Sequence, residues 1–136
     1  MAPNGFGAFL NVRQRLMVSG ERPTIRLSVV VSKNDPLTAS PALRLAQTAV
    51  ASGEEAHVFF TADGLRAVEG RTFDRLPSEL HDAIRDGAAN GVHMHACRAT
   101  MSARGVTRDQ LIPEVEDVIG VRAFLERSAR GHTVFM

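Results

Sequence analysis

The sequence predicts an α/β protein, a three-layer sandwich in which helices cover both faces of a mainly parallel, five-stranded sheet. Three observations support this prediction. Strand-like segments rich in β-branched residues alternate with amphipathic segments of helical length along most of the chain. The strand-like segments are short apolar runs, which is typical of strands buried on both faces. The length of 136 residues suits one domain, and no internal repeat is present.

Five segments have the composition of strands, and helical segments separate them. The strands are expected at residues 25–32, 56–60, 92–97, 116–119 and 132–136. The first long helix is expected to begin with Pro41 at its first helical position and to end at Gly53. Further helices are expected from residue 77 to Gly91, over 98–103 and over 120–130, with short helical turns near 65–68 and 109–112 and an irregular stretch over 71–77. This order favours parallel strands joined by right-handed crossovers.

The composition excludes several classes of function. Sixteen basic residues balance fifteen acidic ones, so no broad positive surface favours nucleic acid. The single cysteine, Cys97, excludes intrachain disulfides and CxxC redox or zinc motifs. No apolar run is long enough for a membrane span or an export signal, so we expect a cytoplasmic protein. Phosphate-binding glycine motifs and the Gly-x-Ser-x-Gly motif of serine hydrolases are missing.

The domain organisation is expected to be simple. Residues 1–23 read as a loosely ordered N-terminal extension, and residues 24–136 as one α/β domain. Two interpretations of the start stay open, because Met17 is also a plausible site of translation initiation.

The strongest candidate for chemistry is Cys97. Ligands of an open parallel sheet bind at the carboxyl ends of its strands, and Cys97 ends the third predicted strand directly before a helix. Backbone N–H groups there favour a thiolate, and Arg98 and Arg104 are expected to add positive charge. The alternative is a buried cysteine that acts as a small apolar side chain.

Weaker candidates lie in the other loops at the same edge. Lys33 and Asn34 follow the first strand, where the lysine is a possible anion contact. Asp63 follows the second strand, in an Asp-Gly pair that is also typical of a turn.

His93 and His95 share one strand face with Cys97, because alternate strand residues point the same way. The three side chains are a conceivable zinc or copper site, although no acidic residue nearby in sequence supplies a fourth ligand. In the alternative, one histidine supports the thiol or a subunit contact and the other lies in the core. His57 and His132 carry no distinct signal of function.

The segment after the cysteine resembles the cysteine motif of the DsrE/DsrF/TusD-like sulfur-relay family. The matching residues are Cys97, Ala99, Arg104, Gly105 and Val106. The Phe-Thr-Ala-Asp-Gly turn at 60–64 and the final helix, Gly-His and strand add a diffuse similarity over residues 24–136. The family often has small apolar residues where this chain has His93 and His95.

The resemblance implies a five-stranded DsrE-like fold that assembles as homotrimers or hexamers and uses no cofactor. It also implies a sulfurtransferase-type carrier in which Cys97 holds sulfane sulfur as a persulfide, between donor and acceptor proteins. A single thiol suits that transfer, whereas dithiol oxidoreductases need a second, resolving cysteine. Three other interpretations stay open: an oligomeric scaffold with an inert Cys97, a metal-binding protein that uses His93, His95 and Cys97, and a peroxide-reducing thiol.

Overall fold

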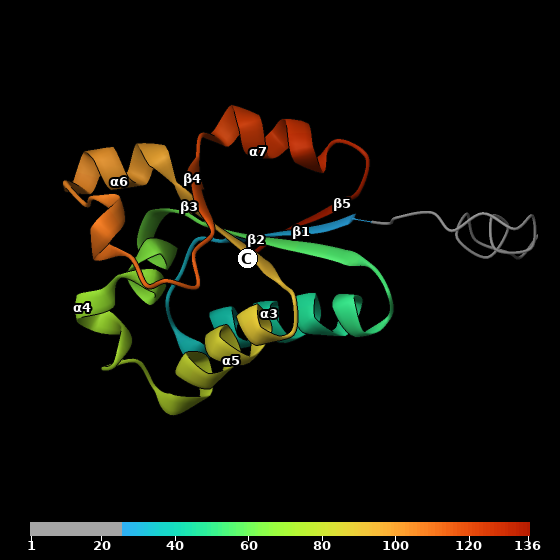
Figure 1. Ribbon diagram of the computed structural model, residues 1–136, viewed down its shortest axis with the longest axis horizontal. Helices are drawn as coiled ribbons and strands as arrows, with labels where there is room; N and C mark the ends of the chain where they lie inside the picture. The colour runs from blue at the N-terminus through green and yellow to red at the C-terminus, as the bar shows by residue number, and fades with distance from the viewer. Residues whose placement is uncertain (1–25) are drawn as a thin grey trace, which may run out of the picture.

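The computed structural model describes residues 26–136, which form a five-stranded sheet with helices on both faces (Figure 1). The strands are β1 (Arg26–Val31), β2 (Glu55–Phe60), β3 (His93–Cys97), β4 (Asp117–Ile119) and β5 (His132–Phe135). Their order is β4-β3-β2-β1-β5, and every neighbouring pair is parallel. The predicted fold class is therefore confirmed. The predictions for residues 1–23 and for Met17 lie outside the described residues.

The helices form two layers around the sheet. On one side lie α3 (Pro36–Ala51) and α5 (Ser78–Ala89), and α7 (Val121–Ser128) covers the other side (Figure 1). Shorter elements follow the carboxyl ends of the strands: η1 (Ala62–Val68), α4 (Gly70–Phe73), α6 (Arg98–Arg104) and η2 (Arg108–Gln110). Within residues 26–136, none of these helices combines the length and the apolar character that a membrane crossing requires.

The start of α3 differs from the prediction. The helix begins at Pro36, five residues before Pro41, which lies inside it. Asp35 is the N-cap, and its side chain accepts a hydrogen bond from the backbone N–H of Thr38 at 3.0 Å. The preference for proline at the first helical position holds, but it applies to Pro36. The stretch expected to be irregular, 71–77, also contains most of α4.

Strand residues alternate between two hydrophobic clusters. The larger cluster lies against α3 and α5 and includes Met94 and Ala96 of β3. The smaller cluster lies beneath α7 and consists of Val30, Phe59, Cys97, Ile119 and Phe124. His93, His95 and Cys97 alternate with Met94 and Ala96 along β3, so they share the α7 face as predicted.

Gly64 allows η1 to cross the carboxyl end of β1 at close range. A Cβ atom on this glycine would lie 2.1 Å from the carbonyl oxygen of Val31, so no other residue fits without a shift of the backbone. The backbone N–H of Gly64 donates to the carbonyl of Thr61 at 2.9 Å. This tight turn holds Thr61 at the sheet edge where β3 also ends.

Candidate functional site

The structure places Cys97 at the predicted junction, as the last residue of β3 and the N-cap of α6. Its side chain is 1% exposed and belongs to the cluster beneath α7. The thiol is therefore buried, with the rings of Phe59 and Phe124 in the same cluster. We therefore expect a reagent to reach the sulfur only when the residues packed around Cys97 move.

The surroundings of the sulfur favour its ionised form. Burial raises the pKa of the Cys97 thiol, but hydrogen bonds from the hydroxyls of Thr100 and Thr61 and from the backbone N–H groups of Thr100 and Ala99 outweigh burial. The net pKa lies below the ordinary value of a cysteine. Hydrogen bonds to a charged group stabilise its charged form, so Cys97 ionises more readily here than a thiol does in an apolar core.

The two threonines hold each other in place. Their Oγ1 atoms lie 3.2 Å apart, and Oγ1 of Thr100 also accepts a hydrogen bond from the backbone N–H of Ala62 at 3.0 Å. Ala62 adopts a φ of +50°, a value uncommon for a residue with a side chain. Sequence reasoning missed both threonines, although Thr61 directly follows β2 and Thr100 lies in the first turn of α6.

The two arginines expected beside the thiol bind elsewhere. Arg98 donates to the carbonyl of Val118 at 3.2 Å. Arg104 pairs with the buried carboxylate of Glu69 at 2.8 Å, and Arg71 lies 3.3 Å from the same carboxylate. The Glu69–Arg104 pair ties α6 to the end of η1. The groups that lower the thiol pKa most are hydroxyl and N–H groups, and the supporting role of the two arginines stays a prediction.

The weaker candidates lie at the carboxyl edge of the sheet, apart from the thiol. Lys33 is exposed and Asn34 is half-buried in the loop between β1 and α3. Asp63 is exposed, and its carboxylate lies 3.7 Å from Nε of Arg66. Within residues 26–136, none of the three hydrogen-bonds to Cys97. Their proposed binding roles stay predictions.

A largely apolar groove of about 340 Å³ shares several lining residues with the surroundings of the thiol, although Cys97 itself does not line it. Three exposed apolar side chains, Val121, Leu125 and Phe135, contribute to its walls. Phe59, Thr61 and Phe124 also line the groove, and these are the residues that lie around Cys97. A larger hollow of about 560 Å³, beside Gln47 and Asn90, contains none of the candidate residues.

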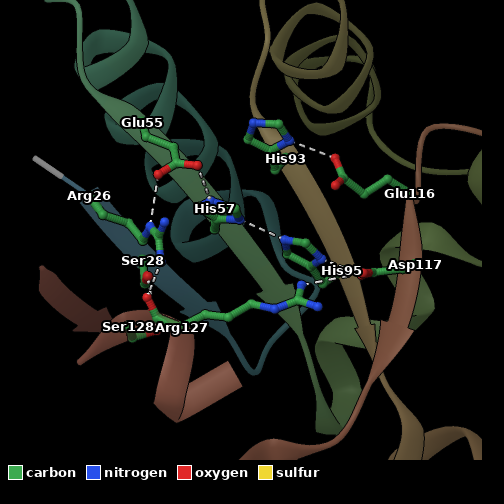
Figure 2. Close-up of polar contacts among 10 residues, drawn as sticks. All are labelled: Arg26, Ser28, Glu55, His57, His93, His95, Glu116, Asp117, Arg127 and Ser128. Carbon is green, nitrogen blue, oxygen red and sulfur yellow. Dashed lines mark hydrogen bonds and ion pairs between the residues drawn. The ribbon is translucent and has the colours of Figure 1, made fainter. Parts of the chain in front are cut away.

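Farther from the carboxyl edge, a row of polar side chains crosses the sheet face that α7 covers (Figure 2). We call it the histidine row; its members are His93, His57, His95 and Asp117. Nδ1 of His57 lies 2.7 Å from Nε2 of His95, and Nδ1 of His95 contacts the carboxylate of Asp117. The ring of His57 stacks between those of His93 and His95, with centroids 4.7 Å and 5.0 Å away. The sequence carries no distinct signal for His57, whose contacts with His93 and His95 come from the pairing of β2 with β3.

Acidic partners reach the row from neighbouring strands. Glu116 accepts from Nδ1 of His93 at 2.7 Å, and Asp117 follows it at the start of β4. Glu55, at the start of β2, lies 3.1 Å from His57. No acidic residue is close to His93 in sequence, but pairing between strands brings acidic side chains to the histidines.

The surroundings lower the pKa values of two members of the histidine row, His57 and Asp117. Burial lowers the pKa of His57, and the charges of His95 and His93 act in the same direction, so together they outweigh the opposing effect of Glu55. Burial raises the pKa of Asp117, but the hydrogen bonds and charges of His95 and Arg127 hold it below its ordinary value. The row therefore contains an imidazole, His57, and a carboxylate, Asp117, whose pKa values both lie below their ordinary values.

The structure does not assemble the ligand set that the sequence suggested. Both ring nitrogens of His95 are engaged, by His57 and by Asp117. Within the described part of the chain, the group with spacing suited to a metal ion is Glu55, His57 and His93, without His95 and Cys97. Cys97 lies at the opposite end of β3 from His93.

The fold and the site together define an all-parallel α/β protein with one thiol at the carboxyl end of an interior strand. Residues 26–135 match the model of the DsrE/DsrF-like family, and the chain belongs to this family. The predicted membership of a DsrE/DsrF-like family is thereby confirmed.

Individual relatives extend this assignment. A protein of Methanopyrus kandleri named uncharacterized protein MK0008 is 33% identical over 76 residues, which is 55% of this chain and 62% of that protein. The chain thus spans less than two thirds of that relative.

Two solved structures share the fold. MTH1491, a protein of unknown function from Methanobacterium thermoautotrophicum, has a TM-score of 0.68 at 19% identity over 82% of this chain and 99% of that one. The ychN protein from E. coli has a TM-score of 0.62 at 14% identity over 84% of this chain and all of its own length.

Proposed function

We propose that this protein carries sulfane sulfur as a persulfide on Cys97. The observation that carries the proposal is the hydrogen-bonded environment of the thiol, which lowers its pKa although the side chain is buried. A thiolate is the nucleophile in sulfur exchange, so stabilisation of that form prepares Cys97 for attack. Membership of the DsrE/DsrF-like family supports the same reading.

The reaction needs only the donor and the thiolate. The Cys97 thiolate attacks the outer sulfur of a donor persulfide and forms a new S–S bond. The S–S bond of the donor breaks, and its thiolate leaves with the electron pair of that bond. Negative charge is conserved and no external oxidant or reductant is required. Passing the sulfur to an acceptor thiolate repeats the same step in reverse.

The surroundings of Cys97 suit such an intermediate. The hydroxyls of Thr61 and Thr100 that stabilise the thiolate are placed to donate to a persulfide anion as well. The apolar groove of about 340 Å³ beside Phe59 and Phe124 offers a surface for the chain that delivers or accepts the sulfur. We expect donor and acceptor proteins as partners, and self-association into a trimer or hexamer, which light scattering would measure.

The direct test is sulfur uptake by the intact chain. After incubation with inorganic polysulfide, the wild-type protein should gain the mass of one sulfur atom, and dithiothreitol should remove it. The matched control is Cys97→Ser, which has no other cysteine to react. Cyanide should convert the bound sulfur to thiocyanate, in an amount equal to the added mass.

Two results would contradict the proposal. Equal uptake by Cys97→Ser would show that the sulfur is bound elsewhere. No uptake by a wild-type protein whose thiol still reacts with iodoacetamide would favour the scaffold reading, in which the burial of Cys97 reflects packing alone.

A further inference from the structure

Three potential metal ligands converge at the amino ends of β2 and β3. A carboxylate oxygen of Glu55 and one ring nitrogen each of His57 and His93 lie within 4.8 Å of one another. Glu55 and His57 are two residues apart on β2, and His93 is the register partner of His57 on β3. Glu55 is 28% exposed and His93 is 42% exposed, so solvent reaches the group.

The hydrogen bonds of the histidine row leave one ring nitrogen of His57 available. The carboxylate of Asp117 only accepts, so Nδ1 of His95 donates to it. Nδ1 of His57 and Nε2 of His95 lie 2.7 Å apart and share one hydrogen bond, in which either ring can donate. When Nδ1 of His57 donates, its Nε2 can offer a lone pair to a cation.

This bare nitrogen faces another acceptor. Nε2 of His57 is buried, and the atom that faces it is Oε1 of Glu55 at 3.1 Å (Figure 2). Two acceptor atoms at this distance repel unless a cation joins them. The contact therefore lacks one positive charge, which either a proton or a metal ion supplies.

The other ligands are oriented by second partners. Nδ1 of His93 donates to Glu116 at 2.7 Å, which leaves Nε2 as the ring nitrogen available to an ion. Nε of Arg26 binds Oε2 of Glu55 at 2.8 Å, and the other carboxylate oxygen, Oε1, faces His57. Histidine ligands that donate their second nitrogen to a carboxylate or another acceptor are typical of metal sites.

We propose that Glu55, His57 and His93 bind one divalent transition-metal ion of the zinc class, with water as the fourth ligand. Two imidazoles and a carboxylate suit such an ion, whereas magnesium and calcium prefer oxygen ligands alone. Ligand atoms on a tetrahedral zinc ion lie about 3.4 Å apart. Rotation of the two more exposed side chains, Glu55 and His93, brings the present group to that spacing. This site does not depend on the persulfide reaction, because it lies at the other end of β3.

Zinc titration of the full-length, tag-free chain by calorimetry tests the proposal. We expect one ion per chain and at least a tenfold loss of affinity in His93→Gln. This variant should fold, because His93 is exposed and its partner Glu116 lies at the surface. The matched control is His132→Gln, an exposed histidine outside the group, which should bind as the wild type does.

Cobalt substitution gives a second measurement. Bound cobalt should show the visible spectrum of a tetrahedral ion with nitrogen and oxygen ligands and no thiolate charge-transfer band, in wild type and in Cys97→Ser alike. Absence of zinc binding would overturn the proposal and leave a proton between Glu55 and His57. Loss of binding in Cys97→Ser, or equal losses in the His93 and His132 variants, would overturn it too.

Discussion

Phe124 is the side chain whose removal should most directly uncover the thiol. It lies on α7, is 2% exposed, and stacks on Phe59 with ring centroids 4.4 Å apart. Replacing a buried phenylalanine by alanine costs about 3–5 kcal/mol. Phe124 also lines the open groove, so water fills part of the space it leaves. We therefore expect Phe124→Ala to lower the free energy of unfolding by about 3 kcal/mol, near the lower end of this range.

The effect on thiol chemistry should exceed the effect on overall stability. If Cys97 reacts when α7 moves away from the sheet, the labelling rate follows the equilibrium constant of that opening. A loss of about 3 kcal/mol confined to α7 packing raises this constant on the order of 100-fold. Labelling with Ellman's reagent under native conditions, together with urea unfolding, measures both quantities.

Phe73→Ala is the matched control for this experiment. Phe73 is 3% exposed and belongs to the larger cluster, which lies against α3 and α5. It should lose a similar free energy of unfolding, while labelling changes less than about tenfold. Equal acceleration in both variants would mean that the thiol reacts only after global unfolding. No acceleration in Phe124→Ala would mean that this ring does not shield the sulfur, and the reasoning would be refuted.

Three further predictions address the site and its support. Thr100→Val removes a hydroxyl that stabilises the thiolate, so the pKa of Cys97 should rise and the midpoint of iodoacetamide reactivity against pH should move upward; an unchanged midpoint would refute this. Gly64→Ala places a Cβ against the carbonyl of Val31 and should lower the free energy of unfolding in urea by about 2 kcal/mol or more. Burial raises the pKa of Asp117, but His95 and Arg127 hold this pKa below its ordinary value in the folded protein. At low pH the unfolded chain therefore binds more protons than the folded one, so the free energy of unfolding falls as the pH drops below about 4. Asp117→Asn should flatten that loss in urea unfolding at successive pH values, and the exposed Asp63→Asn should not.

The fold was predictable because it rests on local patterns. The five strand-like segments and the helices between them carry the periodicities that decide secondary structure. The placement of Cys97 was equally local, since a strand ends and a helix begins within the segment around it. The error at α3 was local as well. Two prolines, Pro36 and Pro41, both suit a helix start, and capping by Asp35 decided between them.

The site's partners were not predictable, because they come from strands and loops far apart in sequence. Thr61 and Thr100 are 39 residues apart and meet only because β2 and β3 are adjacent in the sheet. The contact between His57 and His95 spans 38 residues and depends on the same adjacency. Alternation along a strand tells which residues share a face, but the order of strands decides which of them touch.

The histidine row also bears on why this face of the sheet is polar beneath a single helix. Buried polar groups are tolerated only when they are paired, and an apolar set of similar size would cost less. Ser128 of α7 bonds to Ser28 of β1 at 3.0 Å, so even the covering helix continues the polar pattern. A ligand bound by Glu55, His57 and His93 explains the presence of these buried polar groups, and the free energy that they cost, better than packing does.

The two proposed sites are separable because β3 carries them at opposite ends. Cys97→Ser should abolish sulfur uptake and leave zinc affinity unchanged, whereas His93→Gln should do the reverse. The fully buried His95 lies between these residues on the same strand face, and its ring is 6.4 Å from that of Phe124. If His93→Gln also impaired sulfur uptake, His95 would be the physical link between the two sites, because its ring lies between the metal ligands and the cluster around the thiol.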